Sequence, residues 1–251
     1  MIHWLVQSAD SYPSSPDGVV LDGVLHPREQ ARLATLKTEK RRKDWLLGRW
    51  TAKQLIGEVV ANQTGEKLPF DSIEVRNGAM GDPIVKCQLP MFNSQLLMDD
   101  KQSSILNLQS LVTLSISHSN SHAFCALVEK AEWPLGADIE RIERRSAEFV
   151  TDYFTNEEQA LVNSTPEAMK DVAVTAVWSA KEAVLKALHL GLTVDTRSVA
   201  CLIKVGEERP LTWTPFTVHC DDTRLPQAPP PLTGWWRTYE NFVLTLVVQK
   251  E

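Results

Sequence analysis

The chain has 251 residues, of which 43% are hydrophobic and 23% charged, as is typical of a globular protein with a substantial core. Its formal net charge of −6 argues against a general nucleic-acid binder or membrane-surface binder. No apolar run approaches the roughly 20 residues that cross a bilayer, and the first residues lack the pattern of a signal peptide. The four cysteines have neither metal-ligand nor redox-pair spacing, so we expect a reduced cytoplasmic protein.

The first part of the chain alternates between strand and helix signals. Residues 1–7 predict a short strand. His26-Pro27 puts a proline where the first turn of a helix accepts one. Good helix formers with apolar residues at helical spacing then predict a long helix over residues 40–62. Residues 72–76 and 83–87 alternate and are joined by a turn-rich segment, so they predict two strands.

The second part of the chain repeats these kinds of element. Thr155 and Glu158 form a capping-box pattern that predicts the start of a helix. Residues 168–189 predict a second long helix with an apolar stripe. Four prolines within residues 225–231 predict a loop or an edge connection. Further strands are predicted at residues 111–117, 122–129, 135–140, 211–219, 234–239 and 242–248.

The two parts also resemble each other in sequence. Residues 50–56 align with residues 178–184, and upstream of them residues 29–31 align with residues 158–160 at nearly the same separation. Two matches in register predict a duplicated unit. We therefore expect an α+β fold of two similar subdomains related by a pseudo-twofold, each a small antiparallel sheet packed on a long helix. The predicted subdomains are residues 1–108 and 109–251, with a boundary in the polar stretch near residues 99–109.

Three carboxylates and a lysine could carry chemistry. Asp138 and Glu140 are two apart on a predicted strand, so both side chains lie on one face. Glu182 and Lys186 are four apart on a predicted helix and share a face there. Such a set suits a magnesium ion that bridges to phosphate. The alternative is a strand end with solvated charges and a helix with surface ion pairs, and local spacing leaves open whether strand and helix meet.

Two further patterns have more than one interpretation. His118 ends an apolar strand with Ser117 beside it, which suits a structural histidine or a phosphate contact. A serine–histidine hydrolase lacks support, because no serine lies in a G-x-S-x-G elbow. The basic stretch predicts either a solvated helix face or a site for a polyanion, and it contains Lys37, Lys40, Arg41, Arg42, Lys43 and Arg49.

Residues 136–140 (GADIE) and residues 178–186 (WSAKEAVLK) together resemble the signature pair of the 4′-phosphopantetheinyl transferases. The length and the duplicated halves resemble the surfactin-synthetase-activating type, a pseudo-dimer in one polypeptide. Residues 115–119 resemble the family's serine–histidine motif, and residues 81–83 resemble its Gly-Lys-Pro turn. Residues 27–49 resemble its N-terminal coenzyme A-binding segment, so the resemblance extends from about residue 27 to residue 192.

The resemblance implies a role for each matching residue. Asp138, Glu140 and Glu182 would hold magnesium on the pyrophosphate of coenzyme A, with Lys186 on the same pyrophosphate. Because Glu182 would lie close to both the metal and the reacting phosphate, we expect it to act as general base, directly or through a metal-bound water. Asp82 departs from the pattern, because the family commonly has a basic residue there and an acid would repel phosphate. That contact would either be lost or be supplied by Arg76 or Lys86. The implied phosphate contacts elsewhere are Arg32, Lys43, Arg49, Ser117 and His118.

The implied reaction transfers 4′-phosphopantetheine from coenzyme A to a serine of an apo acyl or peptidyl carrier protein and releases 3′,5′-ADP. Gln54 stands in the N-terminal half where the C-terminal half has Glu182, so we expect one active site per chain, between the halves, in a monomer. Carriers are typically acidic within this family's biology, so Arg141, Arg144 and Arg145 are either a docking strip or a solvated helix start. One alternative is a magnesium-dependent phosphohydrolase acting on a nucleotide. The other is a non-catalytic carrier-binding module, which should have lost a metal carboxylate or the lysine.

Overall fold

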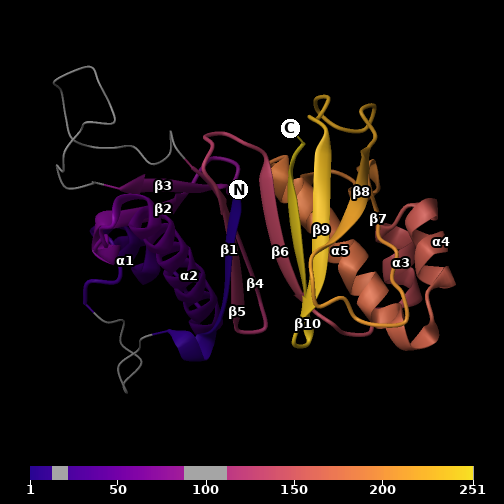
Figure 1. Cartoon of the computed structure of the whole chain (residues 1–251), viewed down its shortest axis with the longest axis horizontal. Coiled ribbons are helices and arrows are strands. Elements are labelled where there is room, and N and C mark those ends of the chain that lie inside the picture. The colour runs from indigo at the N-terminus through magenta and orange to yellow at the C-terminus, as the bar shows by residue number, and fades with distance from the viewer. Residues whose placement is uncertain (13–21, 88–111, 251) are drawn as a thin grey trace.

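The computed structural model describes residues 1–12, 22–87 and 112–250. Four layers follow one another across the long axis of the molecule (Figure 1). Helix α2 (Glu39–Thr64) covers a three-stranded antiparallel sheet, and helix α5 (Lys170–Ala187) covers a five-stranded antiparallel sheet. The two sheets face each other in the middle, so the helices lie outside and the strands inside.

The three-stranded sheet has the order β1-β5-β4, formed by β1 (Ile2–Ser8), β5 (His122–Val128) and β4 (Thr113–Ser119). Helix α1 (Pro27–Ala34) precedes α2, and the strands β2 (Ile73–Asn77) and β3 (Pro83–Cys87) form a separate hairpin after it. The described N-terminal strand therefore pairs with a strand more than 100 residues later, from Ile2 opposite Val128 to Ser8 opposite His122.

The five-stranded sheet has the order β6-β10-β9-β8-β7. Strand β6 carries Asp138, and β10 pairs with β6 so that Thr245 lies opposite that aspartate. Two short helices pass over the outer side beside α5. The bounds are Leu135–Arg141 for β6, Ala147–Tyr153 for α3, Asn156–Ser164 for α4, Val199–Leu202 for β7, Thr214–Cys220 for β8, Leu232–Tyr239 for β9 and Phe242–Gln249 for β10.

Three apolar clusters hold the layers together. One packs α2 on the three-stranded sheet, for example Ile56 on Leu127. A second packs α5 on the outer face of the five-stranded sheet, for example Val184 on Val247. The third lies between the two sheets and contains Phe124, Ile139 and Leu244. Burial of apolar surface on both faces of β10 explains why this strand is an almost continuous apolar run.

Most predicted elements are present with ends shifted by one to three residues. The capping box at Thr155 and Glu158 is formed, and residues 225–231 lie outside the strands. The sequence reading had missed β7 and α3. Strand β7 is only four residues long, and α3 is seven residues with a polar exposed face, so neither gives a strong periodic signal.

The mixed α and β architecture confirms the predicted fold class at that level. The predicted boundary near residues 99–109 lies outside the described residues. The division 1–108 and 109–251 assigns β4 and β5 to the second subdomain, yet β5 pairs with β1 at the N-terminus and β4 pairs with β5. Sheet membership therefore follows the spatial halves of Figure 1 rather than that division of the chain.

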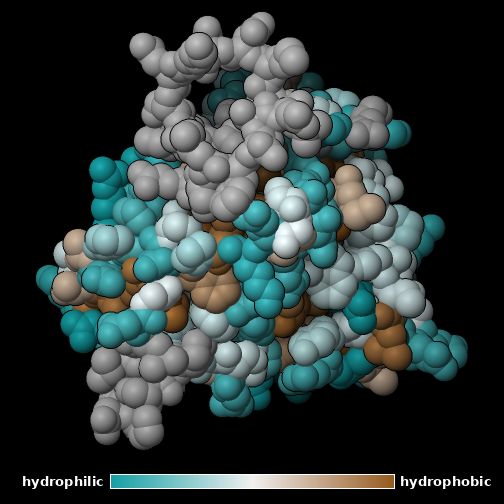
Figure 2. All heavy atoms as spheres, turned by 60° about the vertical axis from the view of Figure 1, so that its left-hand side comes forward, coloured by the Kyte–Doolittle hydropathy of each residue, from teal (hydrophilic) through white to brown (hydrophobic). Residues whose placement is uncertain are grey.

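The described surface is mainly polar. In Figure 2, hydrophilic residues cover most of the visible described surface, and hydrophobic ones occur there in small separate groups. All four cysteines lie in described segments and have free thiols, in agreement with their irregular spacing. Among the helices that the structure describes, none has both the length and the apolar character needed to cross a membrane.

Candidate active site

A cavity of about 580 Å³ lies where the two sheets and α2 meet. One wall comes from α2, another from the end of β4, and the third from β6 and α5. The polar residues that line it are Thr38, Lys40, Arg41, Asp44, Arg49, Asn77, Ser117, His118, Asp138, Glu140, Glu182 and Lys186. The cavity is therefore acidic on the β6 and α5 side and basic on the α2 side.

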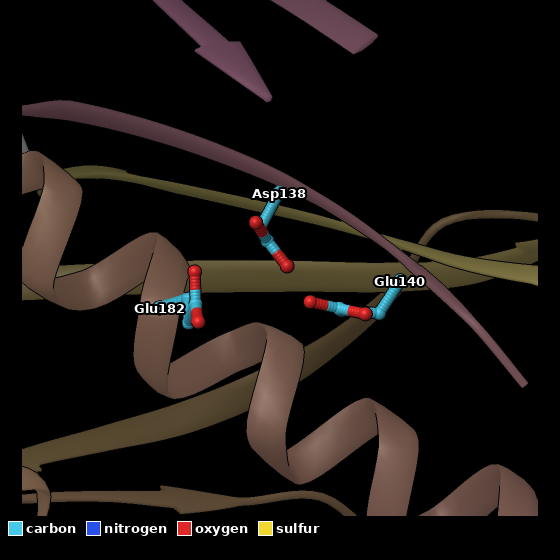
Figure 3. A group of neighbouring side chains, drawn as sticks. All are labelled: Asp138, Glu140 and Glu182. Carbon is cyan, nitrogen blue, oxygen red and sulfur yellow. The ribbon is translucent and has the colours of Figure 1, made fainter. Parts of the chain in front are cut away.

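Three carboxylates converge on the acidic side. Asp138 and Glu140 extend from the same face of β6, and Glu182 reaches toward them from α5 (Figure 3). One carboxylate oxygen of each lies within 4.8 Å of those of the other two. Alternation along the strand places the first two side chains together, and the packing of α5 on β6 brings the third.

This packing depends on a glycine in β6. A Cβ atom added at Gly136 would lie 1.8 Å from the backbone oxygen of Ala183, which is next to Glu182 in α5. Helix and strand therefore approach more closely than any side chain at position 136 would permit. The glycine of the GADIE segment thus brings the helix that carries Glu182 and Lys186 within reach of Asp138.

Asp138 is buried and fully engaged. Its Oδ1 accepts hydrogen bonds from the Ser117 hydroxyl at 2.8 Å and from Lys186 Nζ at 2.5 Å. Its Oδ2 accepts one from the Ser179 hydroxyl at 2.7 Å, and Thr245 bonds to that same hydroxyl at 2.8 Å from β10. Direct contacts from β4 and α5, supported by Thr245 of β10, hold this carboxylate in one orientation, which is what a pre-arranged ligand requires.

Glu140 and Glu182 lack this degree of neutralisation. Burial, followed by repulsion from the Asp138 carboxylate, raises the pKa of each to about 7. Arg145 and Lys186 act in the opposite direction on both groups. Three acids held together against their mutual repulsion form a site that a cation would stabilise.

Arg49 dominates the basic side. It is only 6% exposed, donates to the Asn77 side chain at 2.6 Å and lies 4.8 Å from the centre of the Trp45 ring. Its Nε has no hydrogen-bond partner among the described residues. Lys40 and Arg41 line the cavity just over two turns earlier in α2. This side can therefore bind anionic groups.

Most residues singled out from the sequence meet in this cavity. They are Asp138, Glu140, Glu182, Lys186, Arg49, Ser117 and His118. Ser117 uses its hydroxyl within the acidic cluster, where it donates to Asp138 and accepts from Lys186 at 2.9 Å. His118 is exposed at the rim.

Two predicted phosphate contacts, Arg32 and Lys43, are not among the residues that line the cavity. Arg32 is exposed on α1, where it donates to Thr35 at 3.2 Å. Lys43 pairs with Glu39 at 2.7 Å and lines a neighbouring pocket together with Asn120 and Ser121. Residues 41, 45 and 49 share a helical face toward the cavity, and position 43 lies roughly opposite that face at about 100° per residue. Asp82 also lies outside the lining, although its neighbours Gly81 and Pro83 belong to it.

Several cavity residues had not been singled out. Trp45 precedes Arg49 by four positions, so helical spacing alone could have found it. Ser179 lies within residues 178–186, but nothing in that segment predicts its hydrogen bond to Asp138. Thr245 and Asn77 left no local signal, because sheet pairing and a distant helix bring them to the site.

The family model and the curated relatives agree on one family. The model of the 4′-phosphopantetheinyl transferase superfamily matches residues 134–246. The holo-[acyl-carrier-protein] synthase of Bacillus mycoides is 30% identical over 108 residues, which cover 43% of this chain and 74% of that protein. The synthase of the same name from Bacillus velezensis is 34% identical over 64 residues, which cover 26% of this chain and about half, 52%, of that protein. A solved holo-(acyl-carrier-protein) synthase of Bacillus anthracis in complex with CoA (3′,5′-ADP) is 22% identical, with 52% of this chain and 95% of that chain covered and a TM-score of 0.35.

Proposed function

This chain belongs to the 4′-phosphopantetheinyl transferase superfamily, and we propose that it moves the 4′-phosphopantetheine arm of coenzyme A onto a serine of an apo acyl or peptidyl carrier protein. The observation that carries this proposal is the convergence of Asp138, Glu140, Glu182 and Lys186 in a cavity with a basic opposite wall. The products are the holo-carrier protein and 3′,5′-ADP. The two relatives named above are holo-[acyl-carrier-protein] synthases, which supports a carrier protein as acceptor.

The acidic cluster suits magnesium as the resident cation. Its three ligands are carboxylate oxygens, which are hard donors, and their spacing is small enough for one ion to contact all three. The raised pKa values of Glu140 and Glu182 indicate unneutralised charge that such an ion would balance. A bound magnesium ion would supply charge neutralisation on the phosphate oxygens of coenzyme A.

In this reaction the chain's own residues orient the substrate and move one proton. Glu182 takes the proton from the carrier serine hydroxyl as the serine oxygen forms its bond to the β-phosphorus. The bond between that phosphorus and the oxygen shared with the α-phosphate breaks, and 3′,5′-ADP leaves with the bonding electrons. Lys186 donates hydrogen bonds to the oxygens on which negative charge builds up.

The basic wall suits the phosphates of coenzyme A. Arg49 has an unpaired buried Nε, and Arg41 and Lys40 lie along the same side of the cavity. His118 at the rim can meet the 3′-phosphate of the adenosine, as predicted from the serine–histidine motif. Ser117 contributes there only if it exchanges its present bonds to Asp138 and Lys186.

We also propose that the chain is a duplicated, surfactin-synthetase-activating type transferase, which acts as a monomer with one active site between its halves. Supporting this, each half has a long helix that covers a sheet, and each long helix is preceded by a shorter helix with a capping box. The cavity takes its basic wall from one half and its carboxylates from the other.

The basic residues after β6 provide a docking strip for an acidic carrier. Arg141 and Arg144 are exposed, while Arg145 contacts Glu143 at 3.0 Å and Glu140 at 3.8 Å. Helix α3 begins two residues after Arg145, and the arginine side chain packs 5.2 Å from the Phe149 ring. Arg145 therefore joins this strip to the carboxylate cluster, where a carrier serine must arrive.

The test is mass spectrometry of several purified apo carrier proteins incubated with the enzyme, coenzyme A and magnesium. A mass gain of one phosphopantetheine that disappears without magnesium is the expected result. Glu182→Gln and Asp138→Ala should reduce this gain strongly. Hydrolysis of coenzyme A without any carrier gain would indicate a phosphohydrolase instead. Carrier binding without either reaction would indicate a binding module.

A further inference from the structure

Each long helix carries a buried lysine that the proposed reaction does not use. In α2, Lys53 is 0% exposed on its side chain and donates to Glu29 at 2.5 Å. It also donates to the backbone oxygens of Val24 at 2.9 Å and Phe70 at 2.8 Å. All three protons of the ammonium group therefore have acceptors, and these lie before α1, within α1 and just before β2.

The carboxylate of Glu29 completes this junction. It accepts from the backbone of His26 at 2.9 Å, which caps α1. It also accepts from the backbone of Val75 in β2 at 2.8 Å. One buried ion pair thus ties α2 to α1 and to the β2–β3 hairpin.

The second half contains the same arrangement. In α5, Lys181 has a 0% exposed side chain and lies 2.7 Å from Glu158 Oε2. It donates to Glu158 Oε1 at 2.9 Å and to the backbone oxygen of Val199 at 2.5 Å. Glu158 accepts from the backbone of Thr155 at 2.7 Å, which caps α4, and from Cys201 in β7 at 2.7 Å. This pair ties α5 to α4 and to the edge strand β7.

Stability alone gives little reason to bury two ion pairs. Removing two charges from water costs several kcal/mol per ion, and well-packed apolar residues often stabilise a fold as well or better. What a fully hydrogen-bonded ion pair does provide is a single geometry, because its partners lie in fixed directions. The position of each pair along its helix is therefore the informative feature.

Each pair lies next to one wall of the cavity. Lys181 is adjacent in sequence to Glu182 and five residues before Lys186. Lys53 follows Arg49 by one helical turn. A rotation of a helix by about 10° displaces a side-chain end about 6 Å from the axis by roughly 1 Å. Such a displacement is enough to lower a catalytic rate by about 100-fold.

We propose that the Lys53–Glu29 and Lys181–Glu158 pairs are two matching positioning devices, one for each wall of the active site. Lys181–Glu158 fixes the rotation of α5 and so the place of Glu182 and Lys186 in the metal cluster. Lys53–Glu29 fixes the rotation of α2 and so the place of Arg49 in the anion-binding wall. This inference rests on the proposed function, which assigns a divalent cation to the acidic wall and the phosphates of coenzyme A to the basic wall.

The test compares two matched double variants, Glu158→Gln with Lys181→Met and Glu29→Gln with Lys53→Met. Glutamine keeps an oxygen acceptor for the backbone N–H groups, and methionine keeps much of the lysine volume. Calorimetry would measure Mn²⁺ binding to the free protein and 3′,5′-ADP binding in the presence of a chelator. Transfer assays would give kcat and the KM for coenzyme A, and thermal unfolding would report on the fold.

A crossed pattern is expected. Loss of the α5 pair should weaken Mn²⁺ binding about tenfold or more and lower kcat, while the Kd for 3′,5′-ADP changes by less than about threefold. Loss of the α2 pair should weaken 3′,5′-ADP binding and raise the KM by about tenfold, with Mn²⁺ binding retained. Each variant is the control for the other, because a general loss of stability would affect both ligands alike.

The proposal would be overturned if both folded variants bound Mn²⁺ and 3′,5′-ADP with wild-type affinity. It would also be overturned if each variant lost affinity for both ligands in parallel. If a double variant fails to fold, the single variants Glu158→Gln and Glu29→Gln replace it, and their failure to fold would mark the pairs as purely structural and overturn the proposal. A crossed pattern in binding without any carrier modification by the wild type would keep the proposal and reject the transferase activity. Transfer by the wild type together with an uncrossed binding pattern would support the transferase activity and overturn the positioning proposal. A wild type that binds neither Mn²⁺ nor 3′,5′-ADP would reject both the transferase activity and the positioning proposal.

Discussion

Lys186 Nζ lies 2.5 Å from Asp138 Oδ1 and 3.9 Å from the nearer oxygen of Glu182, so one ammonium group joins the last turn of α5 to strand β6 and also faces a second acid of the cluster. In the free protein this lysine partly neutralises the carboxylates that would hold magnesium. Its charge therefore has opposite effects on cation binding and on phosphoryl transfer.

Lys186→Met should separate these two effects. We expect kcat to fall about 100-fold, because a donor to the developing charge is lost. Mn²⁺ binding to the free protein should be unchanged or several-fold tighter, because a competing positive charge is removed. Lys204→Met, at an exposed position outside the cavity lining, is the control. A strong loss of Mn²⁺ binding in Lys186→Met would contradict this account.

Cation binding should depend on pH because burial and the Asp138 carboxylate raise the pKa of Glu140 and Glu182 to about 7. Protons compete with the cation for these oxygens, so the Kd for Mn²⁺ should be about tenfold or more higher at pH 6 than at pH 8. Calorimetry at the two pH values measures this difference. Glu140→Gln should bind Mn²⁺ more weakly and with a flatter pH dependence. Equal affinity at both pH values would count against the raised pKa values.

The same groups make a prediction for stability without metal. A carboxyl group whose pKa is raised on folding binds its proton more tightly in the folded chain than in the unfolded chain. The contribution of Glu140 and Glu182 to the free energy of unfolding is therefore present at low pH and is lost as the pH rises from about 4.5 toward 7. Glu182→Gln should weaken this decline, as measured by chemical denaturation at a series of pH values in a chelating buffer.

Ser179→Ala tests the support of the buried aspartate. The variant removes the hydrogen bond to Asp138 Oδ2 and leaves Thr245 without its side-chain partner. Loss of such a supporting contact commonly costs 10- to 100-fold in metal affinity, and we expect a weakening of Mn²⁺ binding in about this range. Ser164→Ala on exposed α4 is the matched control, since that hydroxyl bonds only to the backbone of its own helix turn among the described residues.

Two arginines distinguish the cavity wall from the outer surface. Arg49→Met should raise the KM for coenzyme A by roughly tenfold to 100-fold, because a buried guanidinium that faces the cavity is lost. Arg32→Met should change the KM by less than about twofold, since Arg32 is exposed on α1 and outside the cavity lining. Steady-state kinetics with a saturating carrier would measure both. A larger effect at Arg32 than at Arg49 would restore the original sequence-based assignment.

Gly136→Ala tests the approach of α5 to β6. The new Cβ would meet the Ala183 backbone oxygen at 1.8 Å, so helix and strand must separate. We expect a loss of about 3 kcal/mol or more in the free energy of unfolding, together with loss of Mn²⁺ binding. Gly206→Ala, where nothing lies within 4 Å of the added atom, should remain close to the wild type. A stable Gly136→Ala protein with an intact metal site would contradict the packing described for β6.

The sequence by itself determined the local geometry of the site and its chemical class. A spacing of two residues on a strand places Asp138 and Glu140 on one face of β6. A spacing of four residues on a helix places Glu182 and Lys186 on one face of α5. Residues 136–140 and 178–186 then indicated the family, and a family model that matches residues 134–246 supports that identification. The repeated glutamate and lysine positions also predicted the paired halves, but not that each glutamate and lysine would form a buried ion pair.

Only the tertiary structure decided which faces meet. The contact between β6 and α5, the reach of Thr245 from β10 and the separation of Arg32 and Lys43 from the cavity all depend on packing between segments distant in the chain. The helical period places Arg49 and Lys43 on different faces of α2. No local sequence pattern, however, predicts which of these faces lies toward the carboxylates. Backbone geometry fixes the faces of each element over a few residues, whereas the burial of apolar surface between remote elements selects the faces that join.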